Sequence, residues 1–278
     1  MRDLDCAGKR LDLSRPLVMG ILNTTPDSFS DGGAFSDTER AFARAVEMLE
    51  EGADIIDVGG ESTRPGAQSV DEREELDRVI PIISRISREL SVPISIDTSK
   101  PVVMREAVAA GAGMINDVMA LRAPDALETA ARLSVPVCLM HMRGAPRTMQ
   151  DTPFYEDVIG EISGFLMARI DACTSAGISR DRLLVDPGFG FGKTLDHNLQ
   201  MLRELDRFRA LNVPLMIGIS RKSMIGAILN GAPPGERLYG SLAAAVMAAE
   251  RGAAVIRVHD VKATVDAMRV VGAVRPRV

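Results

Sequence analysis

The sequence predicts an α/β protein, a single-domain (β/α)8 TIM barrel, from three observations. Short apolar runs rich in Val, Ile, Leu and Met alternate along the chain with longer stretches of helical periodicity. Eight such runs occur within 278 residues, which matches the strand count and size of this barrel. The runs are continuously apolar, as expected of parallel strands that are buried on both faces. A doubly wound open sheet fits less well because it usually has fewer strands.

The predicted elements follow one another as strand and helix. Residues 1–15 are expected to form an N-terminal arm or hairpin, and residues 16–278 to form the barrel. The strands are expected at residues 17–23, 54–59, 93–97, 114–118, 136–141, 183–186, 214–219 and 255–259. The helices are expected at residues 38–51, 71–90, 101–110, 154–176, 195–211, 223–251 and 261–271. Asp71, with Glu74 three residues later, has the spacing of a capping box at a helix start.

Composition and charge exclude several classes of protein. Hydrophobic residues make up 46 % of the chain and charged residues 26 %, which excludes a disordered or low-complexity protein. A formal charge of −5 gives no general attraction to nucleic acid or to an anionic membrane. The widely separated Cys6, Cys138 and Cys173 indicate neither a disulfide framework nor a zinc site. With no signal peptide or membrane span visible, we expect a cytosolic protein with no nucleic-acid or membrane partner.

The candidate site residues are those that end the apolar runs, because the active site of such a barrel lies at the C-terminal ends of its strands. These residues are Asn23, Asp57, Asp97, Asn116, His141, Asp186, Ser220 and His259. Each alone is equally well explained as a helix N-cap or a turn residue. Together, carboxylates and carboxamides at one mouth suit a flat, nitrogen-rich ring with several N–H donors. Arg64, Arg257 and His259 could hold a phosphate or diphosphate there, although a surface salt bridge is an alternative role for the last two.

Of two turns that contain glycine or serine, one fails the known nucleotide motifs and the other is a candidate anion site. Residues 187–194, Pro-Gly-Phe-Gly-Phe-Gly-Lys-Thr, resemble a nucleotide-binding loop. They match neither nucleotide motif, because Pro187 replaces the first glycine of the Walker A pattern and Lys193 replaces the third glycine of the dinucleotide pattern. Residues 220–223, Ser-Arg-Lys-Ser, open a helix and could receive a small carboxylate, although ordinary N-capping by Ser220 explains them equally well.

Eight sequence blocks, taken in order, resemble the dihydropteroate synthase family. They are NTTPDSFSDGG at 23–33, GGESTRPG at 59–66, SIDT at 95–98, INDV at 115–118, MHMRG at 140–144, DPGFGFGK at 186–193, GISRKS at 218–223 and RVH at 257–259. The resemblance spans nearly the whole chain. It implies a transferase of folate biosynthesis that joins 4-aminobenzoate to 6-hydroxymethyl-7,8-dihydropterin diphosphate and releases diphosphate and 7,8-dihydropteroate. It also implies a homodimer and inhibition by sulfonamides.

The resemblance further implies a role for each matching residue. The pterin ring would be held by Asp97, Asn116, Asp186 and Lys222, with Met140, Phe191 and Gly218 lining its slot and Arg257 lying against the ring. The diphosphate would be surrounded by Asn23, Arg64, Arg257 and His259, and Asn23 would also touch Mg²⁺. Aminobenzoate would lie near Phe29, Thr63, Pro65, Phe191 and Lys222, with its carboxylate at Ser223.

The chemistry favours a substitution in which the diphosphate departs first. An arylamine is a poor nucleophile, and no side chain is an evident base for it. Departure of diphosphate would leave a cation delocalised into the dihydropterin ring, which Asp97 and Asp186 would stabilise in this SN1-like step. We therefore expect Asp97, Asp186, Lys222 and Arg257 to be the catalytic residues, with residues 24–37 and 61–70 closing over the site.

Two other functions remain open from the sequence. Another pterin-binding barrel, such as a methyltetrahydrofolate:corrinoid methyltransferase, would share Asp97, Asn116 and Asp186 but would not need the diphosphate and carboxylate residues. A non-catalytic paralogue that binds pterin or a protein would be expected to have lost some of those residues.

Overall fold

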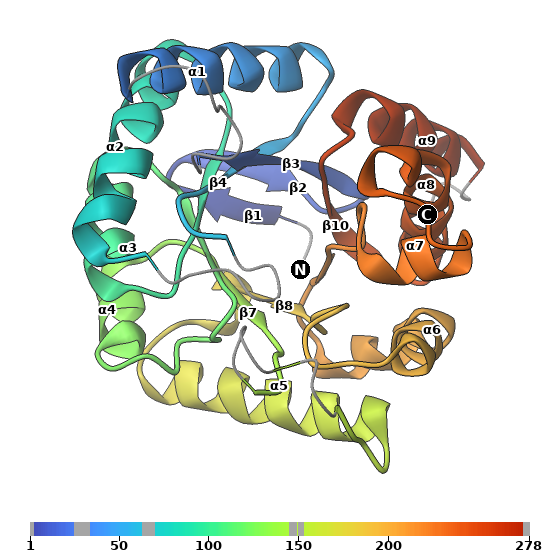
Figure 1. Ribbon diagram of the computed structural model, residues 1–278. Helices are drawn as coiled ribbons and strands as arrows, with labels where there is room; N and C mark the ends of the chain where they lie inside the picture. The colour runs from blue at the N-terminus through green and yellow to red at the C-terminus, as the bar shows by residue number, and fades with distance from the viewer. Residues whose placement is uncertain (1–2, 25–33, 63–69, 145–148, 150–152, 275–278) are drawn as a thin grey trace.

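The computed structural model describes residues 3–24, 34–62, 70–144, 149 and 153–274. Eight parallel strands close into a barrel in the hydrogen-bonded order β10, β3, β4, β5, β6, β7, β8, β9. This closed barrel, surrounded by helices (Figure 1), confirms the predicted fold class. Its strands are β3 (Leu17–Asn23), β4 (Ile55–Gly59), β5 (Ile94–Asp97), β6 (Met114–Asp117), β7 (Val137–Met140), β8 (Leu183–Asp186), β9 (Leu215–Ile217) and β10 (Ala253–Val258).

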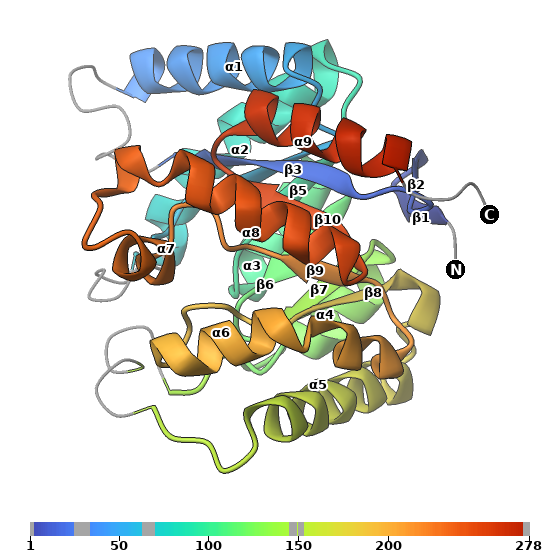
Figure 2. The ribbon, with the colours of Figure 1, turned by 90° about the vertical axis from the view of Figure 1, so that its right-hand side faces the viewer.

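The helices pack around the outside of the barrel, along its length (Figure 2). They are α1 (Ala34–Glu50), α2 (Glu72–Glu89), α3 (Pro101–Ala109), α4 (Ala126–Leu133), α5 (Val158–Ser175), α6 (Leu195–Arg203), α7 (Ser223–Ile228), α8 (Leu238–Glu250) and α9 (Val261–Val274). Short 3-10 helices lie at Arg180–Arg182, Leu205–Leu211 and Pro234–Glu236. As its spacing predicts, Asp71 caps α2, since its carboxylate accepts a hydrogen bond of 2.8 Å from the backbone N–H of Glu74.

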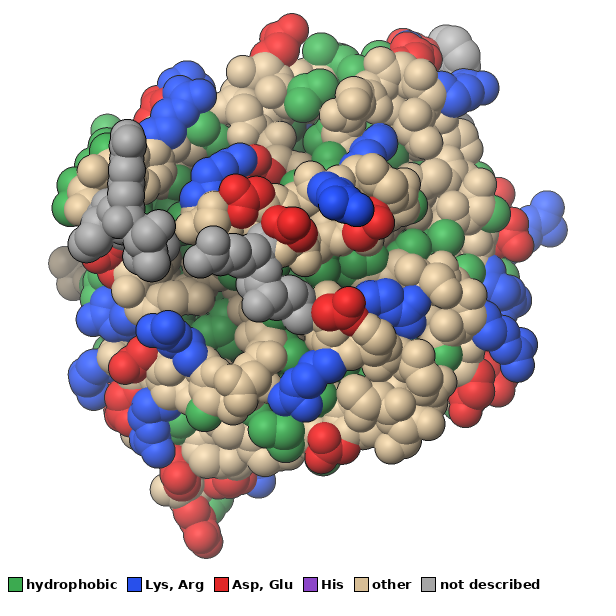
Figure 3. Space-filling view, turned by 180° about the vertical axis from the view of Figure 1, so that it is seen from behind, with side chains coloured by type: hydrophobic (Ala, Val, Ile, Leu, Met, Phe, Trp, Pro, Cys, Tyr) green, Lys and Arg blue, Asp and Glu red, His purple; other side chains and the backbone are tan. Residues whose placement is uncertain are grey.

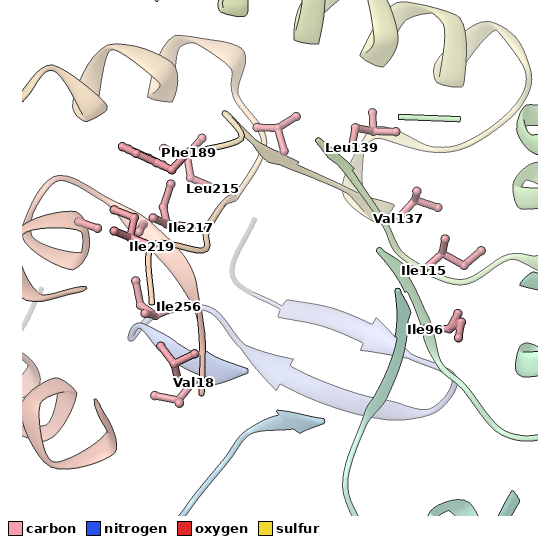
Figure 4. Close-up of a cluster of buried hydrophobic side chains, with 14 of the residues drawn as sticks. Val18, Ile96, Ile115, Val137, Leu139, Phe189, Leu215, Ile217, Ile219 and Ile256 are labelled. Atoms are coloured by element: carbon pink, nitrogen blue, oxygen red, sulfur yellow. The ribbon is translucent and has the colours of Figure 1, made fainter. Parts of the chain in front are cut away.

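The outward faces of the strands form the main hydrophobic core with the helices. Val18, Ile96, Ile115 and Ile256 point away from the barrel axis (Figure 4). Phe189, from the turn after β8, is fully buried in the same core. Because side chains alternate along a strand, the intervening residues point into the barrel, where the site is built.

An N-terminal hairpin covers one end of the barrel. Strands β1 (Asp3–Cys6) and β2 (Lys9–Asp12) pair in antiparallel fashion. Leu4, Cys6 and Leu11 of this hairpin pack against the inward side chains at the N-terminal ends of the barrel strands. Figure 3 views the molecule from this end, where acidic and basic side chains are interspersed. The candidate site therefore lies at the opposite end, where the strands finish.

Several predicted helix boundaries differ from the observed ones. Helix α1 begins four residues before the prediction and α9 ends three residues after it, and three other differences have local reasons. Helix α5 begins at Val158, because Asp157 is its N-cap and accepts a 3.0 Å bond from the Gly160 N–H. The region 223–251 divides into α7 and α8, since Asn230 and the glycine after it have positive φ and two prolines follow. The predicted helix 195–211 ends at Arg203 and continues as a 3-10 helix.

Helix α4 is absent from the sequence prediction. It has eight residues, and its N-cap, Asp125, has a left-handed backbone and makes no capping hydrogen bond. Asp125 and Glu128 have the spacing of a capping box, but the helix is too short for a clear apolar periodicity, which explains why it was missed.

None of the helices in the described ranges is long and apolar enough to cross a membrane.

Candidate active site

The site forms where the inward side chains change from apolar to polar. Met114, Leu184 and Val255 belong to the apolar layer that meets the hairpin. Two residues further along the chain, on the same face of each strand, the side chains are polar or charged. The polar layer consists of Asp57, Asp97, Asn116, Asp186 and Arg257. Strand pairing sets Asp97 beside Asn116 and Asp186 beside Met140, so the barrel register gathers these residues at one depth.

Arg257 joins two carboxylates across the barrel interior. Its Nε donates to Asp57 Oδ2 at 2.6 Å, and its Nη2 donates to Asp97 Oδ2 at 2.7 Å. Asn116 Nδ2 also donates to Asp57 Oδ2, at 3.2 Å. The second oxygens of Asp57 and Asp97 are buried and have no hydrogen-bond partner among the described residues. Such unsatisfied acceptors are costly unless a ligand with N–H donors meets them.

Asp186 and Lys222 form the opposite side of the same space. Asp186 Oδ1 accepts a 2.7 Å bond from the Gly188 N–H, and Lys222 Nζ donates to the backbone carbonyl of Phe189. A Cβ on Gly218 would lie 3.8 Å from Arg257 Cβ and 4.0 Å from Asp186 Oδ2. Gly218 therefore stands between these two charged side chains and leaves space there.

An apolar wall of methionines adjoins the charged groups. Val118, Met140, Met142 and Met149 form a buried cluster, against which Met119 and Phe191 pack. Lys222 Nζ lies 4.4 Å from the centre of the Phe191 ring, in cation–π geometry. Methionine sulfur and an aromatic face are well suited to contact a flat ring.

The remaining predicted side chains surround the mouth. A Cβ on Gly59 would lie 3.7 Å from Asn23 Oδ1 and 3.6 Å from Asp97 Cβ, so Asn23 is a neighbour of Asp97. The backbone N–H of His259 donates to Ser220 Oγ at 3.2 Å, and His259 Nδ1 lies 3.1 Å from the same oxygen. Ser223 is exposed in the first turn of α7.

Burial and pairing shift the proton affinities of the charged groups. Burial raises the pKa of Asp97 to about 7, against the attraction of Arg257. Burial likewise raises the pKa of Asp186, against Lys222, and lowers the pKa of Lys222 to about 8, against Asp186. Burial opposes the charge of Arg257, but the adjacent carboxylates outweigh it and raise the pKa of this group. Acidic and basic side chains with shifted pKa values that face one space are typical of a functional site.

The structure brings together most of the predicted residues, but not all. His141 does not join the mouth: it stands one residue beyond Met140 and therefore points outward, with its ring 4.9 Å from that of Phe165 in α5. Phe29, Thr63, Arg64 and Pro65 lie outside the described residues, as do most of the segments 24–37 and 61–70 that are expected to close over the site.

The sequence prediction gave Asp57 no role beyond that of a strand-end carboxylate. The structure makes it the fully buried partner of both Arg257 and Asn116. Asp57 lies two residues before Gly59 in β4, so its side chain points into the barrel. This strand alternation could have predicted its burial from the sequence.

The described residues contain no cluster of three or more His, Cys, Asp or Glu side chains that could hold a metal ion. The predicted metal contact is a single carboxamide oxygen, Asn23 Oδ1, close to Asp97. This donor set fits Mg²⁺, which is commonly held by one or two protein oxygens together with waters and substrate phosphates.

The fold and site together define a class: a (β/α)8 barrel enzyme with a carboxylate-rich slot for a flat ligand. The family model described as "Pterin binding enzyme" matches residues 19–259. Dihydropteroate synthase of Escherichia coli (strain K12) is 57 % identical over 266 residues, covering 96 % of this chain and 94 % of that protein.

Two solved structures are similar over nearly their whole length. Xanthomonas albilineans dihydropteroate synthase with 4-aminobenzoic acid has a TM-score of 0.94 and 55 % identity, covering 99 % of each chain. Yersinia pestis dihydropteroate synthase in a sulfonamide drug complex has a TM-score of 0.93 and 53 % identity, covering 98 % of each chain. The chain belongs to the dihydropteroate synthase family of pterin binding enzymes.

Proposed function

We propose that the protein is a C–N bond-forming transferase of folate biosynthesis. It condenses 6-hydroxymethyl-7,8-dihydropterin diphosphate with 4-aminobenzoate to give 7,8-dihydropteroate and diphosphate. The observation that carries this proposal is the slot itself, in which buried carboxylates with unsatisfied oxygens face an apolar wall. The relatives and similar structures named above support the same reaction.

The pterin ring binds between the polar layer and the methionine wall. Asp97, Asn116 and Asp186 hydrogen-bond to the N–H groups and nitrogens of the ring, and Lys222 donates to its acceptor edge. Met140, Phe191 and Gly218 line the flat faces of the slot, and Arg257 lies against the ring. The unsatisfied oxygen of Asp97 supports this orientation, because it is an acceptor without a donor.

Diphosphate departs before the new bond forms. Loss of the diphosphate leaves positive charge on the CH₂ carbon and the ring, and the carboxylates of Asp97 and Asp186 stabilise that charge. Arg257 and His259 bind the departing anion together with Asn23 and Arg64. The aminobenzoate nitrogen then attacks the cation, and the proton it loses passes to solvent or to diphosphate.

Asn23 would hold Mg²⁺, which when bound would supply positive charge to neutralise the diphosphate. Chelation with EDTA is expected to abolish turnover, and added Mg²⁺ to restore it. Asn23→Ala should raise the Mg²⁺ concentration needed for half-maximal activity. An unchanged magnesium requirement in that variant would refute the assignment.

Aminobenzoate binds at the outer part of the mouth. Phe29, Thr63, Pro65, Phe191 and Lys222 contact its ring, and Ser223 receives its carboxylate. The exposed position of Ser223 at the start of α7, beside Lys222, supports this placement. A sulfonamide should compete with aminobenzoate and not with the pterin substrate.

The decisive experiment follows the products of the purified protein. Pterin diphosphate and aminobenzoate should yield equal amounts of dihydropteroate and diphosphate. Methyl transfer from methyltetrahydrofolate to a corrinoid, without dihydropteroate formation, would favour the rival methyltransferase. Pterin binding without any product would favour the non-catalytic paralogue. Complementation of a folate-synthesis mutant provides the corresponding test in cells.

We also propose a cytosolic homodimer. Tyr239 of α8 and Val270 and Val274 of α9 are large hydrophobic side chains that remain exposed, and helices α8 and α9 are in contact with each other. A second copy of the chain would cover them. Sedimentation equilibrium should give twice the mass of the chain, 29.9 kDa. A monomer at micromolar concentration would refute the proposal, and cell fractionation tests the location.

A further inference from the structure

The turn after β8 carries a lysine that the proposed reaction does not use. Lys193 resembles a phosphate-binding lysine in the sequence, yet only 3 % of it is exposed. Its amine lies 2.9 Å from His141 Nδ1 and donates to the backbone carbonyl of Phe191 at 3.0 Å. Neither partner is an anion, so Lys193 has the contacts of an internal brace rather than of a phosphate ligand.

The turn that Lys193 holds is part of the slot. It begins at Asp186, whose Oδ1 accepts from the Gly188 N–H at 2.7 Å, and it presents Phe191 to the methionine wall. Gly188 has a φ of +73°, and a Cβ there would lie 1.9 Å from the His141 carbonyl oxygen. The turn is thus pressed against the backbone of His141, whose side chain is the second partner of Lys193.

Other side chains reach the same turn from outside. Tyr155 Oη donates to the Gly192 carbonyl at 2.9 Å, and Asn198 Oδ1 accepts from the Gly190 N–H at 2.7 Å. With these contacts the polar backbone groups around Phe191 are paired, which reduces the number of conformations that the ring can adopt.

We propose that Lys193 is a positioning residue, whose buried amine holds the 187–192 turn so that Phe191 and Asp186 are preorganised for the pterin ring. The inference rests on the proposed function for the identity of the ligand. Burial lowers the pKa of Lys193 well below its usual value, and burial, together with Lys193, lowers the pKa of His141 to about 2. The proposal rests on the two contacts of the Lys193 amine, which join the His141 ring to the backbone carbonyl of Phe191.

The test compares two replacements of Lys193. Lys193→Met keeps most of the length of the side chain but removes its donors, whereas Lys193→Gln keeps two N–H donors without a charge. We expect Lys193→Met to raise the KM for pterin diphosphate about tenfold, because a buried carbonyl loses its partner, while kcat changes less than about threefold. Lys193→Gln should recover most of the loss. Lys262→Met, the same change at an exposed lysine of α9, is the matched control and should leave both constants unchanged.

A second readout does not depend on turnover. Calorimetric titration with 6-hydroxymethyl-7,8-dihydropterin, the substrate without its diphosphate, should show about a tenfold rise in Kd for Lys193→Met. If the wild-type protein binds this pterin but forms no dihydropteroate, the proposed function fails and the calorimetric test of Lys193 still stands.

Three outcomes would overturn the inference. The first is a Lys193→Met protein with a lowered Tm but with Kd and KM within twofold of wild type, which would show a merely structural role. The second is a Lys193→Gln protein as weak as Lys193→Met. If Lys193→Met does not fold, Tyr155→Phe removes a different support of the same turn and should raise Kd about threefold; an unchanged Kd is the third refuting outcome.

Discussion

Replacing Asp97 by asparagine separates the proposed catalytic role of its charge from any role in folding. The introduced carboxamide would keep an oxygen in the place where Asp97 Oδ2 accepts from Arg257 at 2.7 Å. Arg257 would also keep its 2.6 Å ion pair with Asp57, so no buried charge is left alone. The usual cost of about 3–5 kcal/mol for breaking a buried pair therefore does not apply. Relief of the desolvation that raises the pKa of Asp97 offsets part of the lost attraction, and we expect the free energy of unfolding to change by less than about 1 kcal/mol.

Turnover should respond far more strongly than stability. The neutral carboxamide of asparagine cannot stabilise a ring cation as a carboxylate does. Its NH₂ group also donates a hydrogen bond where a carboxylate oxygen of Asp97 would accept one. Loss of one preorganised electrostatic group typically lowers kcat by about 10²–10³-fold, or about 2.7–4 kcal/mol of barrier. Steady-state formation of dihydropteroate and urea unfolding measure the two effects. Asp266→Asn, on the exposed surface of α9, is the control and should change neither. A fully active Asp97→Asn protein, or one that loses activity only because it unfolds, would refute the reasoning.

Three further predictions concern the carboxylate subsite, pH and the core. Ser223→Ala should raise the KM for aminobenzoate about fivefold, as for one lost hydrogen bond, and leave the pterin KM unchanged; equal rises in both would contradict the placement. The pH profile of kcat/KM should be bell-shaped, falling below about pH 7 as Asp97 gains a proton and above about pH 8 as Lys222 loses one, and constant activity from about pH 6 to 9 would exclude these assignments. Phe189→Ala should cost about 3–5 kcal/mol of unfolding free energy in urea titrations, because Phe189 is fully buried; a loss under about 1 kcal/mol would mean that the core closes around the gap.

Barrel strands were predictable because their apolar runs are continuous and end at polar residues. The predicted bounds 17–23 and 183–186 coincide with β3 and β8. The other strands begin or end within two residues of prediction, since apolar residues flanking a strand look like strand residues in the sequence.

The direction of a side chain at a strand end was harder to predict. His141 and Asp186 both end apolar runs, yet His141 points outward and Asp186 points inward. Asp186 is the last residue of β8, whereas His141 comes one residue after the end of β7, and successive side chains point to opposite faces. The run 136–141 includes one residue beyond β7, and that residue reverses the face. The register of each strand decides which way its last side chain points, and the spacing of apolar residues in the sequence does not reveal that register.

Contacts between distant residues could not be read from spacing at all. Arg257 meets Asp57 and Asp97 across 200 and 160 residues of chain, and Lys193 meets His141 across 52. The Arg257 pairs form because β10 pairs with β3 and closes the barrel, whereas Lys193 and His141 meet because they follow the neighbouring strands β8 and β7. Asp97 and Arg257 were already candidates from their places at or near the ends of apolar runs, and the family resemblance gave them roles. Nothing in the sequence indicated that Lys193 contacts His141.

The hairpin β1–β2 has a practical consequence for handling this protein. Because Leu4, Cys6 and Leu11 serve as the floor of the barrel, trimming the first dozen residues would expose Leu17 and Met19 to water and invite aggregation. Extending the chain should be harmless, because the start of the hairpin and the end of α9 both lie at the end of the barrel opposite the proposed substrate entrance (Figure 2). A purification tag or a fused reporter at either terminus would therefore leave that entrance unobstructed. An N-terminal deletion would instead destabilise the end of the barrel opposite the candidate site.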